Sequence, residues 1–182
     1  MKKTLEAEYE AFKAKGLKLD MSRGKPNKAQ LDLTNGMLDT VNSSSDMTAS
    51  DGMETRNYGG LMGIPECRKL MAEIVGADEK NVIIGGVASL TLMYDYISQC
   101  MVFGCGPWCR EEKVKFLCPC PGYDRHFGIL EHFGIKMINI KMNADGPDMD
   151  SIEEYAKDES VKGLFCVPKY SNPDGITFSD EV

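Results

Sequence analysis

Short apolar segments alternate with segments of helical periodicity from residue 63 onward, and this alternation limits the folds open to the chain. Helices are expected over residues 63–76, 89–101, 123–134 and 148–158, and strands over residues 82–86, 114–119, 135–140 and 161–168. Strands joined through helices at short spacing are typical of an α/β domain, because parallel neighbours need a crossover connection. We therefore predict an α/β fold with three layers, in which helices flank a largely parallel sheet.

The first part of the sequence has a different pattern. A helix is expected over residues 5–15, followed by an irregular segment over residues 17–57 that is rich in polar and turn-forming residues. Such a long irregular segment in a compact protein is usually functional or packed on a partner. We therefore divide the chain into an N-terminal helix with an extended segment, residues 1–57, and a main part, residues 58–182.

Composition and charge exclude several classes of protein. The 182 residues are 42% hydrophobic and 27% charged, an ordinary composition for a soluble domain. The formal net charge of −7 disfavours sequence-independent binding to nucleic acid. The sequence has no apolar run long enough to cross a membrane, and its N-terminal residues are too polar for a signal peptide. We therefore expect no nucleic-acid or membrane partner and a cytoplasmic location.

Four of the seven cysteines lie close together in the sequence: Cys105, Cys109, Cys118 and Cys120. Zinc sites favour cysteine pairs separated by two residues, whereas these pairs are separated by three residues and by one. We therefore expect reduced thiols and no metal.

Three of the expected strands end in residues suited to contact a ligand. Ligands of open α/β sheets bind beyond the carboxyl ends of strands. The stretch GGVASL, residues 85–90, places glycines between a strand end and a helix start, where free backbone N–H groups favour an anion such as phosphate. Tyr123 can present its ring to a planar ligand, and the amide of Asn172 can donate to an oxygen. Each feature also has a simpler interpretation: a tight turn, a core tyrosine and an Asn-Pro turn.

In this chain order, the three features resemble those of class I aminotransferases, which are fold-type I pyridoxal-phosphate enzymes. The nearest resemblance is to the aspartate-aminotransferase-like subgroup that carries the MocR and alanine–glyoxylate aminotransferase names. The matching stretches are DMSRGKP, RNYGGLMGIPECRKLMAEI, IIGGVASLTLMYD, CPCPGYDRHF and VPKYSNPDGITFSDE. They cover nearly all of the sequence after Leu19, and RNYGGLMGIPE and PKYSNPDG are the most specific. The resemblance implies that residues 58–182 form the first part of the large, cofactor-binding domain.

The resemblance also implies roles for single residues. Gly86, Val87 and Ala88 would hold the phosphate of pyridoxal 5'-phosphate through their backbone N–H groups. Tyr123 would stack on the pyridine ring of the cofactor. Asn172 would donate a hydrogen bond to the phenolic oxygen of the ring and help to keep that oxygen anionic.

Two positions outside the expected sheet also match the family. Tyr58 would reach the phosphate bound by the neighbouring subunit of a homodimer. Gly24 would lie in the segment that closes over the substrate, an amino acid or a 2-oxo acid.

One departure is visible in the Asn-Pro turn, because Asp174 stands where the family commonly has threonine. Since the asparagine and glycine of that turn are retained, we expect the turn to survive.

The resemblance further implies groups that this sequence does not contain. In the family, the imine-forming lysine, the acidic partner of the pyridine nitrogen and the substrate-binding arginine all follow the Asn-Pro turn. We therefore expect an incomplete fold, a fragment of a parent aminotransferase that acts on an aspartate-like amino acid. No catalytic residue is assigned in this chain, and Lys169 is not expected to form the imine.

Two other functions remain open from the sequence. One is a non-catalytic domain that binds a phosphate ligand through the same glycine turn. The other is a regulatory domain of the MocR type. The acidic charge and the absence of a helix-turn-helix pattern before residue 20 argue against the regulator.

Overall fold

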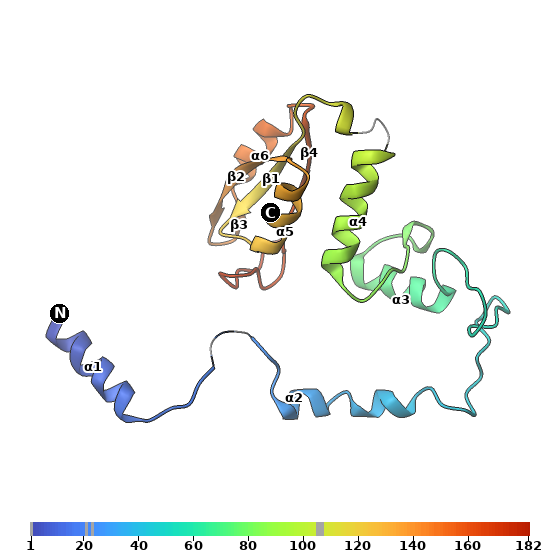
Figure 1. Cartoon of the computed structure of the whole chain (residues 1–182), viewed down its shortest axis with the longest axis horizontal. Coiled ribbons are helices and arrows are strands. Elements are labelled where there is room, and N and C mark those ends of the chain that lie inside the picture. The colour runs from blue at the N-terminus through green and yellow to red at the C-terminus, as the bar shows by residue number, and fades with distance from the viewer. Residues whose placement is uncertain (1, 21, 23, 105–107) are drawn as a thin grey trace. The chain divides into compact units, whose positions relative to one another are not determined.

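The structure is a computed structural model that describes residues 2–20, 22, 24–104 and 108–182. The chain divides into two compact units, Met1–Gly59 and Gly60–Val182. The four strands that the structure describes all lie in the second unit, together with the helices that flank them (Figure 1).

The first unit contains α1 (Lys2–Ala14), α2 (Lys28–Asp32) and a 3₁₀ helix, Asn35–Asp39. The N-terminal helix was expected from the sequence, but irregular structure throughout residues 17–57 was not borne out. At the start of α2, the Asn27 side chain accepts a hydrogen bond from the Gln30 N–H at 3.0 Å. The Gln30 side chain accepts one from the Asn27 N–H at 2.8 Å. This reciprocal capping box stabilises a short helix in a segment that has no long periodic pattern.

The second unit contains α3 (Pro65–Val75), α4 (Ser89–Val102), β1 (Lys115–Cys120), α5 (Asp124–His132), β2 (Lys136–Asn143), β3 (Gly146–Pro147), α6 (Met149–Tyr155) and β4 (Val161–Leu164). Two 3₁₀ helices, Glu79–Asn81 and Trp108–Arg110, lie between these elements. The four helices expected here are confirmed. Local signals explain their ends: Pro65 occupies the first turn of α3, and Gly76 ends α3 with φ of 69°.

The sheet has the strand order β3-β2-β1-β4, with β1 parallel to both β2 and β4. Lys115 of β1 pairs with Lys136 of β2 and with Val161 of β4. The expected α/β fold with a largely parallel sheet is therefore confirmed. The short strand β3 pairs antiparallel with β2 and was not anticipated, because two residues are too few to leave a pattern in the sequence.

The core lies against β1, which is buried on both faces. Phe116 and Cys118 lie on one face of β1 and pack in a cluster with Ile97 of α4 and Leu130 of α5. Leu117, which points to the opposite face because side chains alternate along a strand, is only 3% exposed. Burial on both faces is typical of the central strand of a three-layer α/β domain.

One expected strand does not form. Residues 82–86 form no strand and pair with none of the strands that the structure describes. The Ile84 N–H donates instead to the Met62 carbonyl at 3.0 Å, and the Val82 carbonyl accepts from the Arg68 side chain. The apolar run predicted a buried strand, but a strand also needs a neighbour for its backbone, and here α3 and the turn before it take that place.

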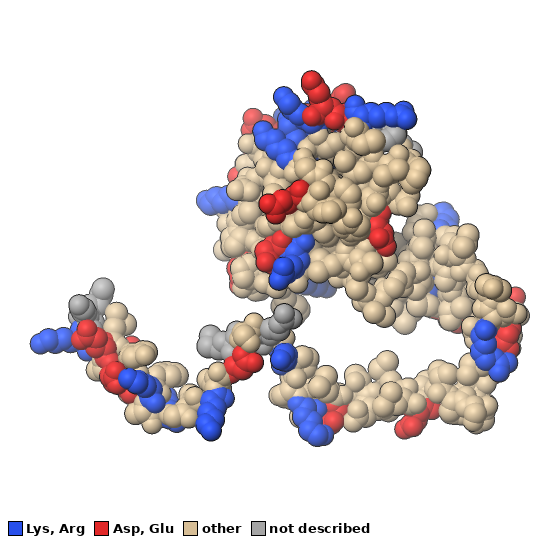
Figure 2. All heavy atoms as spheres, viewed as in Figure 1, with Lys and Arg blue, Asp and Glu red and all other residues tan. Residues whose placement is uncertain are grey.

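Charges of both signs are interspersed over the visible face of the second unit, and neither sign forms a continuous patch there (Figure 2). In the described ranges, every helix is too short or too polar to cross a bilayer.

Candidate functional site

Tyr123 stands at the carboxyl end of β1, where it is the residue before the first turn of α5. The turn that delivers it depends on Gly122. A Cβ atom built on Gly122 would lie 2.4 Å from the Pro119 carbonyl oxygen and 2.7 Å from the Phe127 ring. Because no real Cβ approaches a backbone oxygen so closely, this turn requires glycine. The Pro-Gly pair seen in the sequence thus sets where the tyrosine leaves the strand.

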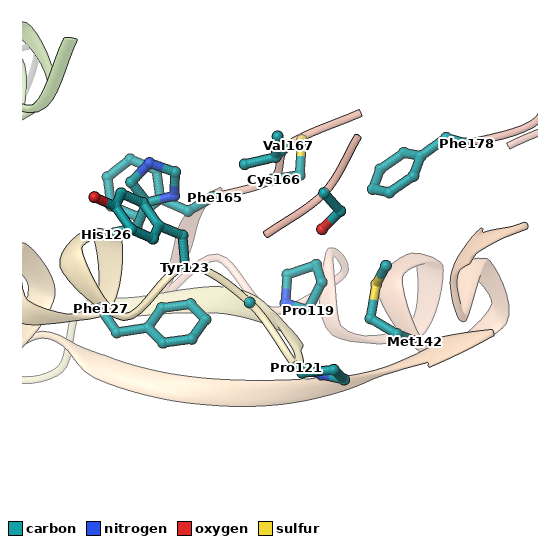
Figure 3. Close-up of a pocket in the computed structure, with 12 residues that line it drawn as sticks. Pro119, Pro121, Tyr123, His126, Phe127, Met142, Phe165, Cys166, Val167 and Phe178 are labelled. Atoms are coloured by element: carbon teal, nitrogen blue, oxygen red, sulfur yellow. The ribbon is translucent and has the colours of Figure 1, made fainter. Parts of the chain in front are cut away.

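The Tyr123 ring is one member of an aromatic stack at this strand end (Figure 3). The ring stands edge-on to the imidazole of His126, with 5.1 Å between the ring centroids. The imidazole in turn lies 5.3 Å from the Phe165 ring, which follows β4. His126 is only 6% exposed, and this burial lowers its pKa, so the neutral ring is favoured. The stack joins residues that follow two parallel strands.

A small cavity opens beside the stack, at the same edge of the sheet. It has a volume of about 10 Å³, roughly that needed to admit one water molecule. Tyr123, His126 and Phe165 are among the residues that line it (Figure 3). Ser171 lines it as well. The cavity therefore brings the exit of β1 together with the chain that follows β4.

The Asn-Pro turn is a closed loop that exposes its asparagine. The Ser171 N–H donates to the Ile176 carbonyl at 2.8 Å, and the Gly175 N–H donates back to the Ser171 carbonyl. Ser171 is 6% exposed, whereas the next residue, Asn172, is exposed. The Asp174 carboxylate accepts a hydrogen bond from the Ile176 N–H at 3.3 Å. The aspartate that departs from the family pattern thus contributes to the turn.

The glycine turn is exposed at the start of α4. Gly86, Val87 and Ala88 are all exposed. The Ala88 carbonyl accepts from the Thr91 and Leu92 N–H groups, as in a first helical turn. Among the described residues, no acceptor contacts the N–H groups of Gly86, Val87 and Ala88. Donors left open at a helix N-terminus are able to bind an anion, and the helix dipole favours one there.

The helices that follow the glycine turn and Tyr123 are neighbours. The Tyr94 hydroxyl of α4 and the His132 ring of α5 are hydrogen-bonded at 3.2 Å. A groove of about 440 Å³ runs between α4 and α5, and its lining includes Leu90 of α4 and Asp124 of α5. The first turns of both helices thus border one groove, although none of Gly86, Tyr123 and Asn172 lines it.

Gly24 and Tyr58, the other two residues assigned from the sequence, belong to the first unit. Tyr58 is 99% exposed, and its N–H donates a hydrogen bond to the Asn57 side-chain oxygen at 2.8 Å. Gly24 is exposed, and a Cβ atom built on it would have no atom within 4 Å. Space alone therefore does not require glycine at position 24.

Three residues of the site were missed from the sequence: His126, Phe165 and Ser171. His126 lies one helical turn after Tyr123, so the spacing could have indicated that the two rings meet. Phe165 and Ser171 come from a distant part of the chain, and no local pattern indicates that they line the cavity at the end of β1.

The cysteines show different environments. Burial raises the pKa of Cys118 to about 12, and burial also raises the pKa of Cys120. Cys109 is exposed, and Cys105 lies outside the described residues. Within the part of the chain that is described, no three His, Cys, Asp or Glu side chains gather as metal ligands.

Comparison with known proteins identifies the family. The family model of aspartate amino-transferase matches residues 1–182. An aspartate aminotransferase of Corynebacterium glutamicum is 45% identical over 98% of this chain, which spans 42% of that relative's length. The structure of an aspartate transaminase from the same species has a TM-score of 0.85 at 44% identity, over 99% of this chain and 43% of that one.

A more distant structure shares the fold. It is an alpha-aminoadipate aminotransferase of Thermus thermophilus, complexed with N-(5'-phosphopyridoxyl)-L-leucine. It has a TM-score of 0.53 at 22% identity and is matched over 68% of this chain and 29% of that one. The close and the distant comparisons agree with the sheet and helices described above, and the chain belongs to the aspartate amino-transferase family.

Proposed function

We propose that this chain supplies cofactor contacts of a pyridoxal-phosphate-dependent aminotransferase, which transfers an amino group between an aspartate-like amino acid and a 2-oxo acid. The observation that carries the proposal is the Tyr123 ring, which His126 and Phe165 hold at the end of β1. The loop that exposes Asn172 follows β4, and its Ser171 lines the small cavity that Tyr123 also lines. The relatives named aspartate aminotransferase support the same activity.

The glycine turn fits the phosphate of this cofactor. The N–H groups of Gly86, Val87 and Ala88 are open, and they stand at the positive end of the α4 dipole. Backbone donors and the helix dipole both favour a phosphate at this point. A side chain at position 86 would not be excluded by space, since no atom lies within 4 Å of a Cβ built there.

Tyr123 and Asn172 fit the ring of the cofactor. A tyrosine ring fixed by its neighbours offers a flat apolar surface on which a pyridine ring can stack. The exposed amide of Asn172 is able to donate a hydrogen bond to the oxygen on that ring, which favours the anionic form of the oxygen. When bound, pyridoxal phosphate supplies the carbonyl carbon and the electron-withdrawing ring on which amino transfer depends.

The remaining roles extend the proposal to the assembled protein. Tyr58 reaches the cofactor phosphate of the partner subunit in a homodimer, and Gly24 lies in the segment that covers the substrate. The nearly full exposure of Tyr58 is consistent with a contact made outside its own unit. The protein is proposed to act in the cytoplasm.

Calorimetric titration of the chain with pyridoxal 5'-phosphate tests the proposal. The unmodified chain is expected to bind the cofactor. Tyr123→Ala and Asn172→Ala are each expected to weaken binding by about fivefold, the loss of one stacking contact or one hydrogen bond. Tyr155→Ala is the matched control, because this tyrosine lies on α6 and lines neither the cavity nor the groove. Unchanged affinity in both site variants would contradict the proposal.

A further inference from the structure

The side chain of Arg68, which lies on α3, is hydrogen-bonded to the segment that precedes the glycine turn, residues 79–85. Its Nε donates to the Val82 carbonyl at 3.1 Å, and its Nη2 donates to the Glu79 carbonyl at 2.8 Å. Arg68 is half-buried. A guanidinium presents its donors in a rigid plane, so one arginine fixes two carbonyls relative to each other and to its own helix.

The segment needs such a tether because it has no strand beside it in the described structure. The Ile84 N–H donates to the Met62 carbonyl at 3.0 Å. A Cβ atom built on Gly63, where φ is 94°, would lie 2.7 Å from the Ile84 side chain. The segment is thus held from the side of α3 by Arg68 and by the turn that leads into this helix.

The other end of the segment is held by α4. A Cβ atom built on Gly85 would lie 2.2 Å from the Leu92 side chain, so the backbone at this glycine lies directly on the helix. The turn formed by Gly86, Val87 and Ala88 follows at once. The position of its N–H groups is therefore set by two contacts. One is the pair of hydrogen bonds from Arg68 before the turn, and the other is the close approach of Gly85 to Leu92 at its start.

We propose that Arg68 is a positioning residue for the anion-binding turn Gly86–Ala88. It does not contact the anion. It holds the carbonyls of Glu79 and Val82 and thereby sets the position at which the open N–H groups face a phosphate. The identity of that phosphate rests on the proposed function, whereas the tether rests on the hydrogen bonds of Arg68 alone.

The experiment compares Arg68→Lys, which keeps the charge but loses the planar fork, with Arg110→Lys. Arg110 is an exposed arginine in the 3₁₀ helix after α4. In Arg68→Lys, hydrogen exchange at Val82 and Ile84, whose N–H groups donate to the Glu79 and Met62 carbonyls, is expected to be about tenfold faster, while exchange at Leu117 and Leu130 in the core stays unchanged. The affinity for pyridoxal 5'-phosphate is expected to fall by about tenfold, and that for pyridoxal, which lacks the phosphate, to stay the same. Arg110→Lys is expected to match the unmodified chain in each measurement.

Two results would overturn the inference. One is unchanged exchange at Val82 and Ile84 in Arg68→Lys. The other is faster exchange throughout the core with equal loss of affinity for both ligands, which would indicate a general structural role. If the unmodified chain binds pyridoxal as tightly as pyridoxal 5'-phosphate, the proposed phosphate site is wrong. Exchange at Val82 and Ile84 then still decides whether Arg68 holds the segment before the turn.

Discussion

The ring of Tyr123 stands edge-on to the imidazole of His126, with an angle of 86° between the two planes. This arrangement directs the edge of one ring toward the face of the other, which is a favoured geometry for aromatic pairs. The Phe165 ring, which also contacts the imidazole, is tilted by 37° to it. The orientation of Tyr123 thus depends on a histidine that is buried and favoured in its neutral form.

The stability of the protein is expected to fall as the pH drops below the ordinary histidine value. Burial lowers the pKa of His126 from 6.5 in the folded state, whereas the unfolded chain keeps the ordinary value. Between the two values the unfolded chain binds more protons, so this contribution to stability is complete above about pH 6.5 and is lost as the pH falls toward the folded pKa. Urea unfolding from about pH 8 to about pH 5 measures it.

His126→Phe separates this effect from that of the acidic groups, because it keeps a ring in the stack without a titrating proton. The destabilisation on acidification is expected to be smaller in the variant than in the unmodified chain. An identical pH dependence of the two proteins would show that His126 does not contribute.

Gly122→Ala is expected to destabilise the fold by about 2 kcal/mol, because the added methyl group meets the Pro119 carbonyl oxygen and the backbone must shift. Gly128→Ala is the matched control, since a Cβ at this exposed position on α5 has no atom within 4 Å. The control is expected to stabilise the protein by up to about 1 kcal/mol through helix propensity. Thermal unfolding compares the two variants, and an equal effect of both would contradict the close approach at Gly122.

The chain is expected to associate rather than to sediment as a single monomer. Tyr58 and Leu61 are each 99% exposed, and exposed apolar side chains promote association. Tyr58→Ala is expected to shift the distribution toward the monomer, whereas Tyr155→Ala on α6 should leave it unchanged. Sedimentation velocity at low micromolar concentration measures the distribution. A monodisperse monomer that is unaffected by Tyr58→Ala would leave the proposed subunit contact without support.

The sequence predicted elements whose signals are local. The helices of the second unit follow from apolar spacing, and their ends follow from Pro65, Gly76 and Gly134, the last of which has φ of 66° after α5. The strands β1 and β2 follow from apolar runs between turn residues. The same local criterion failed at residues 82–86, because pairing depends on a neighbour that no local pattern specifies.

The sequence by itself determined the chain order of the glycine turn, Tyr123 and Asn172, and it determined the turns in which they lie, since glycine and proline act on their own backbone. The tertiary structure decided which side chains surround these residues. The parallel pairing of β1 with β4 brings Phe165 and Ser171 to the exit that carries Tyr123. The tertiary structure also decided that Arg68 donates hydrogen bonds to the carbonyls of Glu79 and Val82, in the segment before the glycine turn. Contacts between residues far apart in the chain depend on packing and on hydrogen bonds across elements, and these exist only once the elements have come together.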